Sequence, residues 1–103
     1  MKQLLLFTIF ALLAGVAFAA PPKYTVFQYE AAHLKANQRH LQEHKRCVVI
    51  KNPGPCLDVN DAKWRKDQAK IYARKVGTPH ARAEATRIIR EQDARMRDAG
   101  LIP

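Results

Sequence analysis

Two histidines stand one helical turn apart and could hold a metal ion. His40 and His44 have the i, i+4 spacing that lets two imidazoles chelate one zinc or copper ion from a helix face. His33 precedes His40 by seven residues, about 10 Å along a helix, which is too far for the same ion. A third ligand would have to come from His80 or from a second molecule. The pair is a candidate zinc or copper site, and an exposed polar flank is the alternative.

The two cysteines are the other residues that could do chemistry. Cys47 and Cys56 lack the Cys-x-x-Cys spacing typical of redox pairs and many metal sites. The segment Asn52-Pro53-Gly54-Pro55 between them favours a turn that brings the two sulfurs together. An even cysteine count in an exported protein is typical of disulfides. We therefore predict a structural Cys47–Cys56 disulfide that closes a short turn.

Residues 1–19 have the three parts of a secretory signal peptide. Lys2 supplies the positive start, residues 4–20 are almost continuously apolar, and Ala17 and Ala19 are the small residues before the cleavage point. Cleavage after Ala19 would leave residues 20–103 as one small domain, secreted or periplasmic. An uncleaved membrane anchor is the alternative, because the apolar run is just long enough to span a bilayer.

Helical spacing of apolar residues predicts that this domain is all-α, with three helices. Thr25 and Gln28 have the pattern of a capping box, so we expect the first helix from about Val26 to about Arg46. The second helix should follow a cap at Asp58 or Asn60.

The end of the second helix and both ends of the third are marked by residues typical of helix boundaries. Gly77 is expected to cap the second helix in a left-handed conformation. Thr78-Pro79 should open the third helix. Gly100 should end it, with Leu101 returning to Met96.

Each helix has one expected core-facing stripe, with residues three or four apart. The stripes are Phe27, Ala31, Leu34, Gln38 and Leu41; then Trp64, Gln68, Ile71, Tyr72 and Val76; then Ala81, Ala85, Ile88, Ile89, Gln92, Met96 and Ala99. The first two helices should form an antiparallel hairpin. The third helix could fold back on that hairpin or extend away, and its seam from Ala85 to Ala99 could mediate self-association in a homo-oligomer.

The chain carries 18 Lys and Arg against 9 Asp and Glu, a formal net charge of +9. Removal of Lys2 with the signal peptide lowers that charge by one. The cations gather on helix faces away from the predicted stripes, namely Lys63, Lys66, Lys70 and Arg74 in the second helix and Arg87, Arg90 and Arg97 in the third. Such faces favour an anionic partner, and a merely solvated surface is the alternative.

Catalysis is not expected, because the sequence has no Ser-His-Asp arrangement, Gly-rich phosphate loop or paired carboxylates in an apolar setting. Sequence-specific nucleic-acid binding is not expected either, since aromatic residues do not interleave with the basic stripe. The sequence predicts an exported, non-enzymatic, cationic protein without a required cofactor. Its partner would be lipid head groups, an envelope polyanion or an acidic protein. A zinc- or copper-binding protein and a self-associating structural protein are the alternatives.

Overall fold

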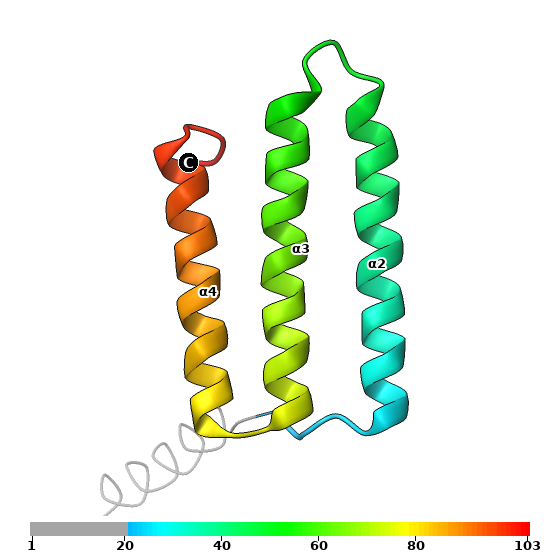
Figure 1. Ribbon diagram of the computed structural model, residues 1–103, viewed down its shortest axis with the longest axis vertical. Helices are drawn as coiled ribbons and strands as arrows, with labels where there is room; N and C mark the ends of the chain where they lie inside the picture. Colours follow the sequence, from blue (N-terminus) through cyan, green and yellow to red (C-terminus); the bar gives the residue numbers. More distant parts are fainter. Residues whose placement is uncertain (1–20) are drawn as a thin grey trace, which may run out of the picture.

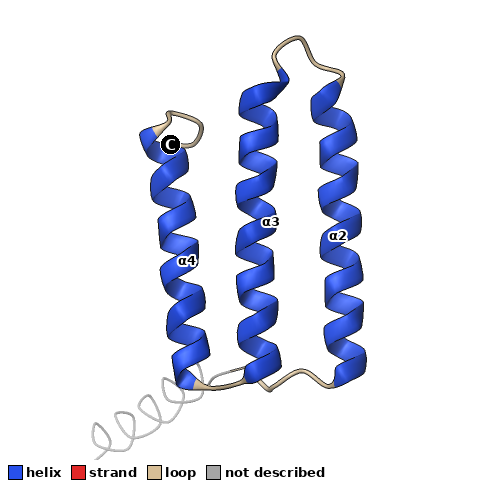
Figure 2. Ribbon diagram, in the orientation of Figure 1, coloured by secondary structure: helices blue, strands red, loops and turns tan. Residues whose placement is uncertain are grey.

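The computed structural model describes residues 21–103 and contains three α-helices (Figures 1 and 2). They are α2 (Val26–Val48), α3 (Pro53–Val76) and α4 (Pro79–Asp98). Residues 21–103 contain no strand, so the predicted all-α class with three helices is confirmed. The predicted signal peptide lies outside the described residues. No helix in the described part is long and apolar enough to cross a membrane.

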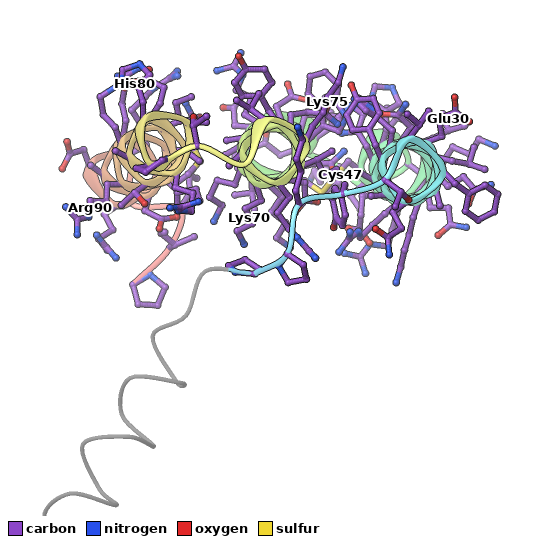
Figure 3. All side chains as sticks on the ribbon, turned by 90° about the horizontal axis from the view of Figure 1, so that it is seen from below. Glu30, Cys47, Lys70, Lys75, His80 and Arg90 are labelled. Carbon is purple, nitrogen blue, oxygen red and sulfur yellow. A yellow bond between two sulfur atoms is a disulfide. The ribbon has the colours of Figure 1, made fainter. Side chains whose placement is uncertain are left out.

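The three helices form a single layer with α3 in the middle. α3 packs against α2 on one side and against α4 on the other, whereas α2 and α4 do not contact each other within residues 21–103. The end-on view shows this arrangement directly (Figure 3). A layer one helix thick leaves two broad faces open to solvent. The central helix must therefore have two packing sides and two exposed sides.

Side-chain caps fix the start of two helices, as predicted. The Thr25 hydroxyl accepts a hydrogen bond from the Gln28 backbone N–H at 3.1 Å, and the Gln28 side chain accepts one from the Thr25 N–H at 3.0 Å. Thr78 accepts a hydrogen bond from the Ala81 N–H at 3.1 Å at the start of α4. These bonds satisfy backbone donors that have no partner inside the helix.

The turn between α3 and α4 depends on Gly77. Its φ of 72° lies in the left-handed region, and its N–H donates to the Ala73 carbonyl at 2.8 Å. A Cβ at this position would lie 3.2 Å from the Lys23 side chain. Both the backbone conformation and the close approach of Lys23 therefore favour glycine here.

The C-terminal end of α4 has the cap that the sequence predicts. Gly100 has a φ of 71°. The Leu101 N–H donates to the Met96 carbonyl at 2.9 Å. This is the 6→1 hydrogen bond of a Schellman motif.

α3 begins earlier than the sequence analysis placed it. The helix starts at Pro53 rather than after Asp58 or Asn60. Proline is well tolerated in the first helical turn, where its missing N–H leaves no hydrogen bond unmade. Cys56 is consequently inside α3 and Cys47 inside α2, so the confirmed disulfide joins the ends of two helices across a Cα–Cα distance of 5.5 Å.

The predicted stripe of α2 was wrong. Phe27, Leu34 and Leu41 are 80%, 61% and 53% exposed, while Ala36 and Cys47 are the buried residues of this helix. The disulfide supplies the physical reason. Because Cys47 must point at α3, the residues facing α3 are those at helical spacing before it, which include Ala36 and His40 rather than the leucines.

α3 has two packing sides where the sequence analysis predicted one. Ile71 is buried toward α2, whereas Ala69 and Ala73 are buried against Ala85 of α4. Tyr72, predicted to face the core, is 57% exposed because it lies between these two sides. The apolar stripe of α3 is thus divided between its two neighbours.

The predicted stripe of α4 is confirmed along most of its length. Its residues Ala81, Ala85, Gln92 and Met96 are buried. Ala99 is exposed, since it is the C-cap beyond the last turn that α3 covers. The third helix therefore folds back on the hairpin, and its alanine seam packs within the chain.

Candidate functional site

Four cations of α3 occur at helical spacing on one open side of the helix. Lys63 and Lys70 are exposed, and Lys66 and Arg74 are half-buried. Figure 3 shows Lys70 pointing out of one face of the layer, while Lys75 points out of the other. We call the side that carries Lys70 the basic face.

Lys66 connects this face of α3 to α4. Its Nζ lies 2.8 Å from Oδ1 of Asp93, and both side chains are about a quarter exposed. The hydrogen bond from Lys66 holds the pKa of Asp93 below its usual value, and the charges of Lys66, Arg97 and Lys70 act in the same direction. Asp93 is therefore surrounded by cations from two helices, which shows that α3 and α4 contribute to the same basic face.

Arg74 fastens the segment before α2 to the end of α3. Its guanidinium donates to the Pro22 carbonyl at 3.2 Å and to the Tyr24 hydroxyl at 3.1 Å. It also lies 4.0 Å from the centroid of the Tyr24 ring. The Tyr24 N–H donates in turn to the Arg74 carbonyl at 2.8 Å. Arg74 is thus largely committed to these contacts and is a weaker candidate for external binding than Lys63 or Lys70.

The three predicted arginines of α4 do not act together. Arg90 points out of the basic face in Figure 3, and Arg97 lies seven residues later on the same side of the helix. Arg87 instead pairs with Glu84 and with Glu91 at 2.8 Å. Arg87 lies only about 60° around the helix from Arg90, so it stays near the side that the sequence predicts, but next to its acidic partners. Its charge is locally balanced, because the side chain lies with the acidic residues three and four positions away.

The pKa values of the Arg87 cluster reflect this local pairing. The hydrogen bond from Arg87 lowers the pKa of Glu84, and the same bond raises the pKa of Arg87. Both shifts favour the charged forms of the two side chains. Arg87 is therefore part of an ion-paired surface of α4 and not of the basic face.

Two further cations join the basic face that sequence reasoning missed. Arg39 of α2 lines a groove of about 290 Å³ together with Lys63, Lys66 and Lys70. Arg82 of α4 lines a second groove, of about 370 Å³, and Lys70, Arg74, Ala85 and Ile89 line it too. Lys70 lies between the two grooves. The signal for these residues was only their helical spacing, which is uninformative until the packed sides are known.

The acids of the basic face all pair with cations. Asp67 pairs with Arg39 at 3.5 Å, Asp93 with Lys66, and Glu43, which lines the first groove, with Arg46. None of the ion pairs within residues 21–103 involves Lys63, Lys70 or Arg90. The face therefore keeps a positive excess at its centre.

Within residues 21–103 the structure does not bring a third ligand to His40 and His44. The His40 ring packs on Trp64 with centroids 5.2 Å apart, and its Nε2 lies 3.8 Å from Asp61. His80, proposed as a third ligand, belongs to α4, which does not contact the helix that carries His40 and His44. Residues 21–103 contain no group of three or more His, Cys, Asp or Glu that could hold a metal ion.

His40 is instead part of the α2–α3 interface, where the neighbouring polar groups hold the two helices together. The Asn60 amide donates to the His40 carbonyl at 3.0 Å, and the Trp64 indole donates to Asn37 at 3.1 Å. His40 is therefore partly buried against α3, whereas His44 is exposed, as the alternative of an exposed polar flank expects.

No protein-family model, curated protein or solved structure matches this chain.

Proposed function

We propose that this protein is an exported, non-enzymatic binding protein that docks on an anionic surface through its basic face. The observation that carries the proposal is a group of cations from α3 and α4 on one open side of a single-layer fold (Figure 3). Among them, Lys63, Lys70 and Arg90 take part in no ion pair within residues 21–103, and Lys70 and Arg90 both point out of this side. A flat, positively charged face suits an extended polyanion, because many weak contacts can form at once without a deep pocket.

The compartment is inferred from the cysteines. The Cys47–Cys56 disulfide indicates an oxidising environment, such as the periplasm or the extracellular space. The apolar run of residues 4–20 supports export by a cleaved signal peptide. In those compartments the anionic partners are lipid head groups, envelope polymers or acidic proteins.

The proposal predicts a steep salt dependence. Short duplex DNA is a suitable probe, because its counterion release is well calibrated and the binding needs no base recognition. The logarithm of the affinity should fall linearly with the logarithm of the salt concentration. Each cation that contacts the polyanion contributes roughly 0.9 to that slope.

A pair of matched double variants identifies the face that binds. Lys63→Ala with Lys70→Ala removes two exposed cations of the basic face. Arg65→Ala with Lys75→Ala removes the same charge from α3, but Lys75 points out of the opposite face in Figure 3 and Arg65 lies about 140° around the helix from Lys70. The first variant should lower the salt slope by about 1.8, two cations at 0.9 each. The control should lower it much less.

Fluorescence anisotropy with the labelled duplex gives both slopes, and circular dichroism shows that each variant is folded. Anionic phospholipid vesicles and a sulfated polysaccharide, tested in the same way, then rank the natural partner classes. Equal losses in the two variants would mean that only the net charge matters. In that case the basic face is a solvated surface and the proposal fails.

A further inference from the structure

The exposed apolar side chains are concentrated along one edge of the layer. Eight large apolar residues of the described part are exposed, and seven of them lie on α2 or in the turn that follows it. Three lie on the helix side opposite α3, where Phe27, Leu34 and Leu41 are 80%, 61% and 53% exposed. A stripe of this kind on a small protein marks an interaction surface.

The positions of these residues are symmetric about the middle of α2. The stripe is Phe27, Leu34, Leu41 and Val48, with consecutive members seven residues apart, flanked at its two ends by Val26 and Val49. Reversing the helix about a point between Asn37 and Gln38 exchanges Val26 with Val49, Phe27 with Val48, and Leu34 with Leu41. The stripe is therefore complementary to a reversed copy of itself.

We infer that two copies of this chain associate through the outer face of α2, antiparallel and related by a two-fold axis. Residues seven apart stay on nearly the same side of a helix, with a drift of about 20° per repeat, so the stripe can line one contact along two packed helices. A two-fold axis requires a self-complementary surface, and the symmetric order of the stripe supplies one. In this arrangement Leu34 packs against Leu41 of the second copy, and Phe27 against Val48 of the second copy.

The charges beside the stripe favour the antiparallel direction. Glu30 points away from α3 in Figure 3, and none of the ion pairs within residues 21–103 includes it. In the antiparallel pair Glu30 is level with His44 and Lys45 of the second copy. A parallel pair would instead bring Glu30 opposite Glu30 and Lys45 opposite Lys45, and like charges across an interface cost affinity.

The arrangement of the helices in the dimer places the basic faces of both copies on the same side. Within one chain, α4, α3 and α2 alternate in direction (Figure 1), and an antiparallel second α2 continues that alternation. The two-fold axis is then perpendicular to the layer. Such an axis leaves both basic faces on the same side of a six-helix layer. Two basic faces on one surface would raise affinity for an extended polyanion by effective concentration.

The interface is small, so the dimer should dissociate on dilution. About ten residues of each α2 would take part, against the roughly 20–30 a side of a standard interface. We expect the molar mass of the protein, purified with its disulfide intact, to change from dimer to monomer as the concentration falls. Sedimentation velocity measures this directly.

Three variants test the surface. Leu34→Glu and Leu41→Glu each place a charge at the centre of the seam, and each should leave only monomer at concentrations where the unaltered protein is dimeric. Tyr72→Glu is the control, because Tyr72 is the one exposed large apolar residue outside this region. It should not change the mass. Circular dichroism confirms that all three are folded.

Crosslinking tests the direction. Gln38 lies next to the proposed two-fold axis, so Gln38→Cys should form a symmetric disulfide between copies on mild oxidation. Phe27→Cys should not, since the antiparallel pair separates the two Phe27 positions by most of the helix length. The reverse result would indicate a parallel pair and overturn the proposed arrangement.

A protein that stays monomeric at all concentrations overturns the proposal. If Leu34→Glu then abolishes binding to vesicles of phosphatidylglycerol, the occupant of the stripe is lipid rather than a second copy. These measurements need no polyanion, so they can fail while the proposed function stands. Conversely, dimerisation can be found even if the basic face binds nothing.

Discussion

The two sides of α3 are built on different principles. On one side the Cys47–Cys56 disulfide and hydrogen bonds from Asn60 and Trp64 hold α2. On the other side small residues, among them Ala69 and Ala85, allow α4 to pack closely.

This difference has a consequence for the rest of the surface. Because a covalent bond and polar contacts determine which side of α2 faces α3, the large apolar residues of α2 lie on its other sides and remain exposed. The α4 side has no such bond, and α4 places its own stripe, including Met96, against α3. Most of the exposed large apolar side chains of the described part therefore lie on α2 or in the turn that follows it, and Tyr72 of α3 is the exception.

Removing the disulfide should have the largest effect and should act unequally on the two sides. Cys47→Ser with Cys56→Ser frees a loop of about ten residues and lowers the free energy of unfolding by about 2.7 kcal/mol in the loop-closure entropy account. Amide hydrogen exchange should show a greater loss of protection in α2 than in α4. Equal losses in both helices would contradict the contrast between the two interfaces.

Enlarging an alanine should destabilise the contact between α3 and α4. Ala85→Leu inserts three heavy atoms where Ala69 and Ala73 are in close contact, and overpacking of this kind costs about 1–3 kcal/mol. Ala83→Leu, on the exposed side of the same helix, is the matched control and should be nearly neutral. Urea unfolding of both variants measures the difference. A neutral Ala85→Leu would mean that the α3–α4 contact is loose.

The two sides of α3 also differ in how their buried amide side chains are hydrogen-bonded. Asn60 of the α2 side is 5% exposed and hydrogen-bonded, whereas Gln92 of the α4 side is 7% exposed and its Oε1 has no hydrogen-bond partner in the described part. Asn60→Ala should lower the free energy of unfolding by about 1 kcal/mol, since the His40 carbonyl keeps its helical hydrogen bond.

Gln92→Met should leave stability unchanged or raise it, because it removes an unpaired polar atom from a packed position. Thermal unfolding compares the two. Destabilisation by Gln92→Met would contradict this assignment.

The features that could be predicted from the sequence are those set by local chemistry. The caps at Thr25 and Thr78, the left-handed Gly77 and the disulfide each depend on a few neighbouring residues, and all were confirmed. The stripe of α4 was predicted correctly because only one of its sides is apolar. These signals do not require knowledge of the partner helix.

The side of α2 that packs could not be obtained by choosing the most apolar one. Leu34 and Leu41 outweigh Ala36 on any scale of hydrophobicity, yet Cys47 decides the orientation. Ala36 and His40 lie on the same side of the helix as Cys47, so the disulfide places them against α3. The local balance of the Arg87 charge has a different cause, because Glu84 and Glu91 lie three and four residues away and face it on the same helix.

The smallest expected effect concerns Asp93, which joins α4 to the basic face of α3. Its pKa in the folded protein is lowered from the usual 3.8, chiefly by the hydrogen bond from Lys66. A lowered folded pKa contributes stability above the usual pKa, and that contribution is lost as the pH falls below about 3.8 through the folded value. Asp93→Asn should therefore remove a small part of the acid destabilisation, seen as a flatter dependence of the unfolding midpoint on pH.

The same substitution should strengthen polyanion binding, because it releases Lys66 and removes a negative charge from the basic face. Asp98→Asn is the matched control, since it changes the net charge equally but lies at the exposed end of α4. If Lys66 joins the contacts, the salt slope with the duplex probe should steepen by about 0.9 in Asp93→Asn only. A similar change in both variants would mean that net charge acts without regard to position. A weaker affinity in Asp93→Asn would show that the bond between Lys66 and Asp93 is needed to keep the cations of α3 and α4 on one surface.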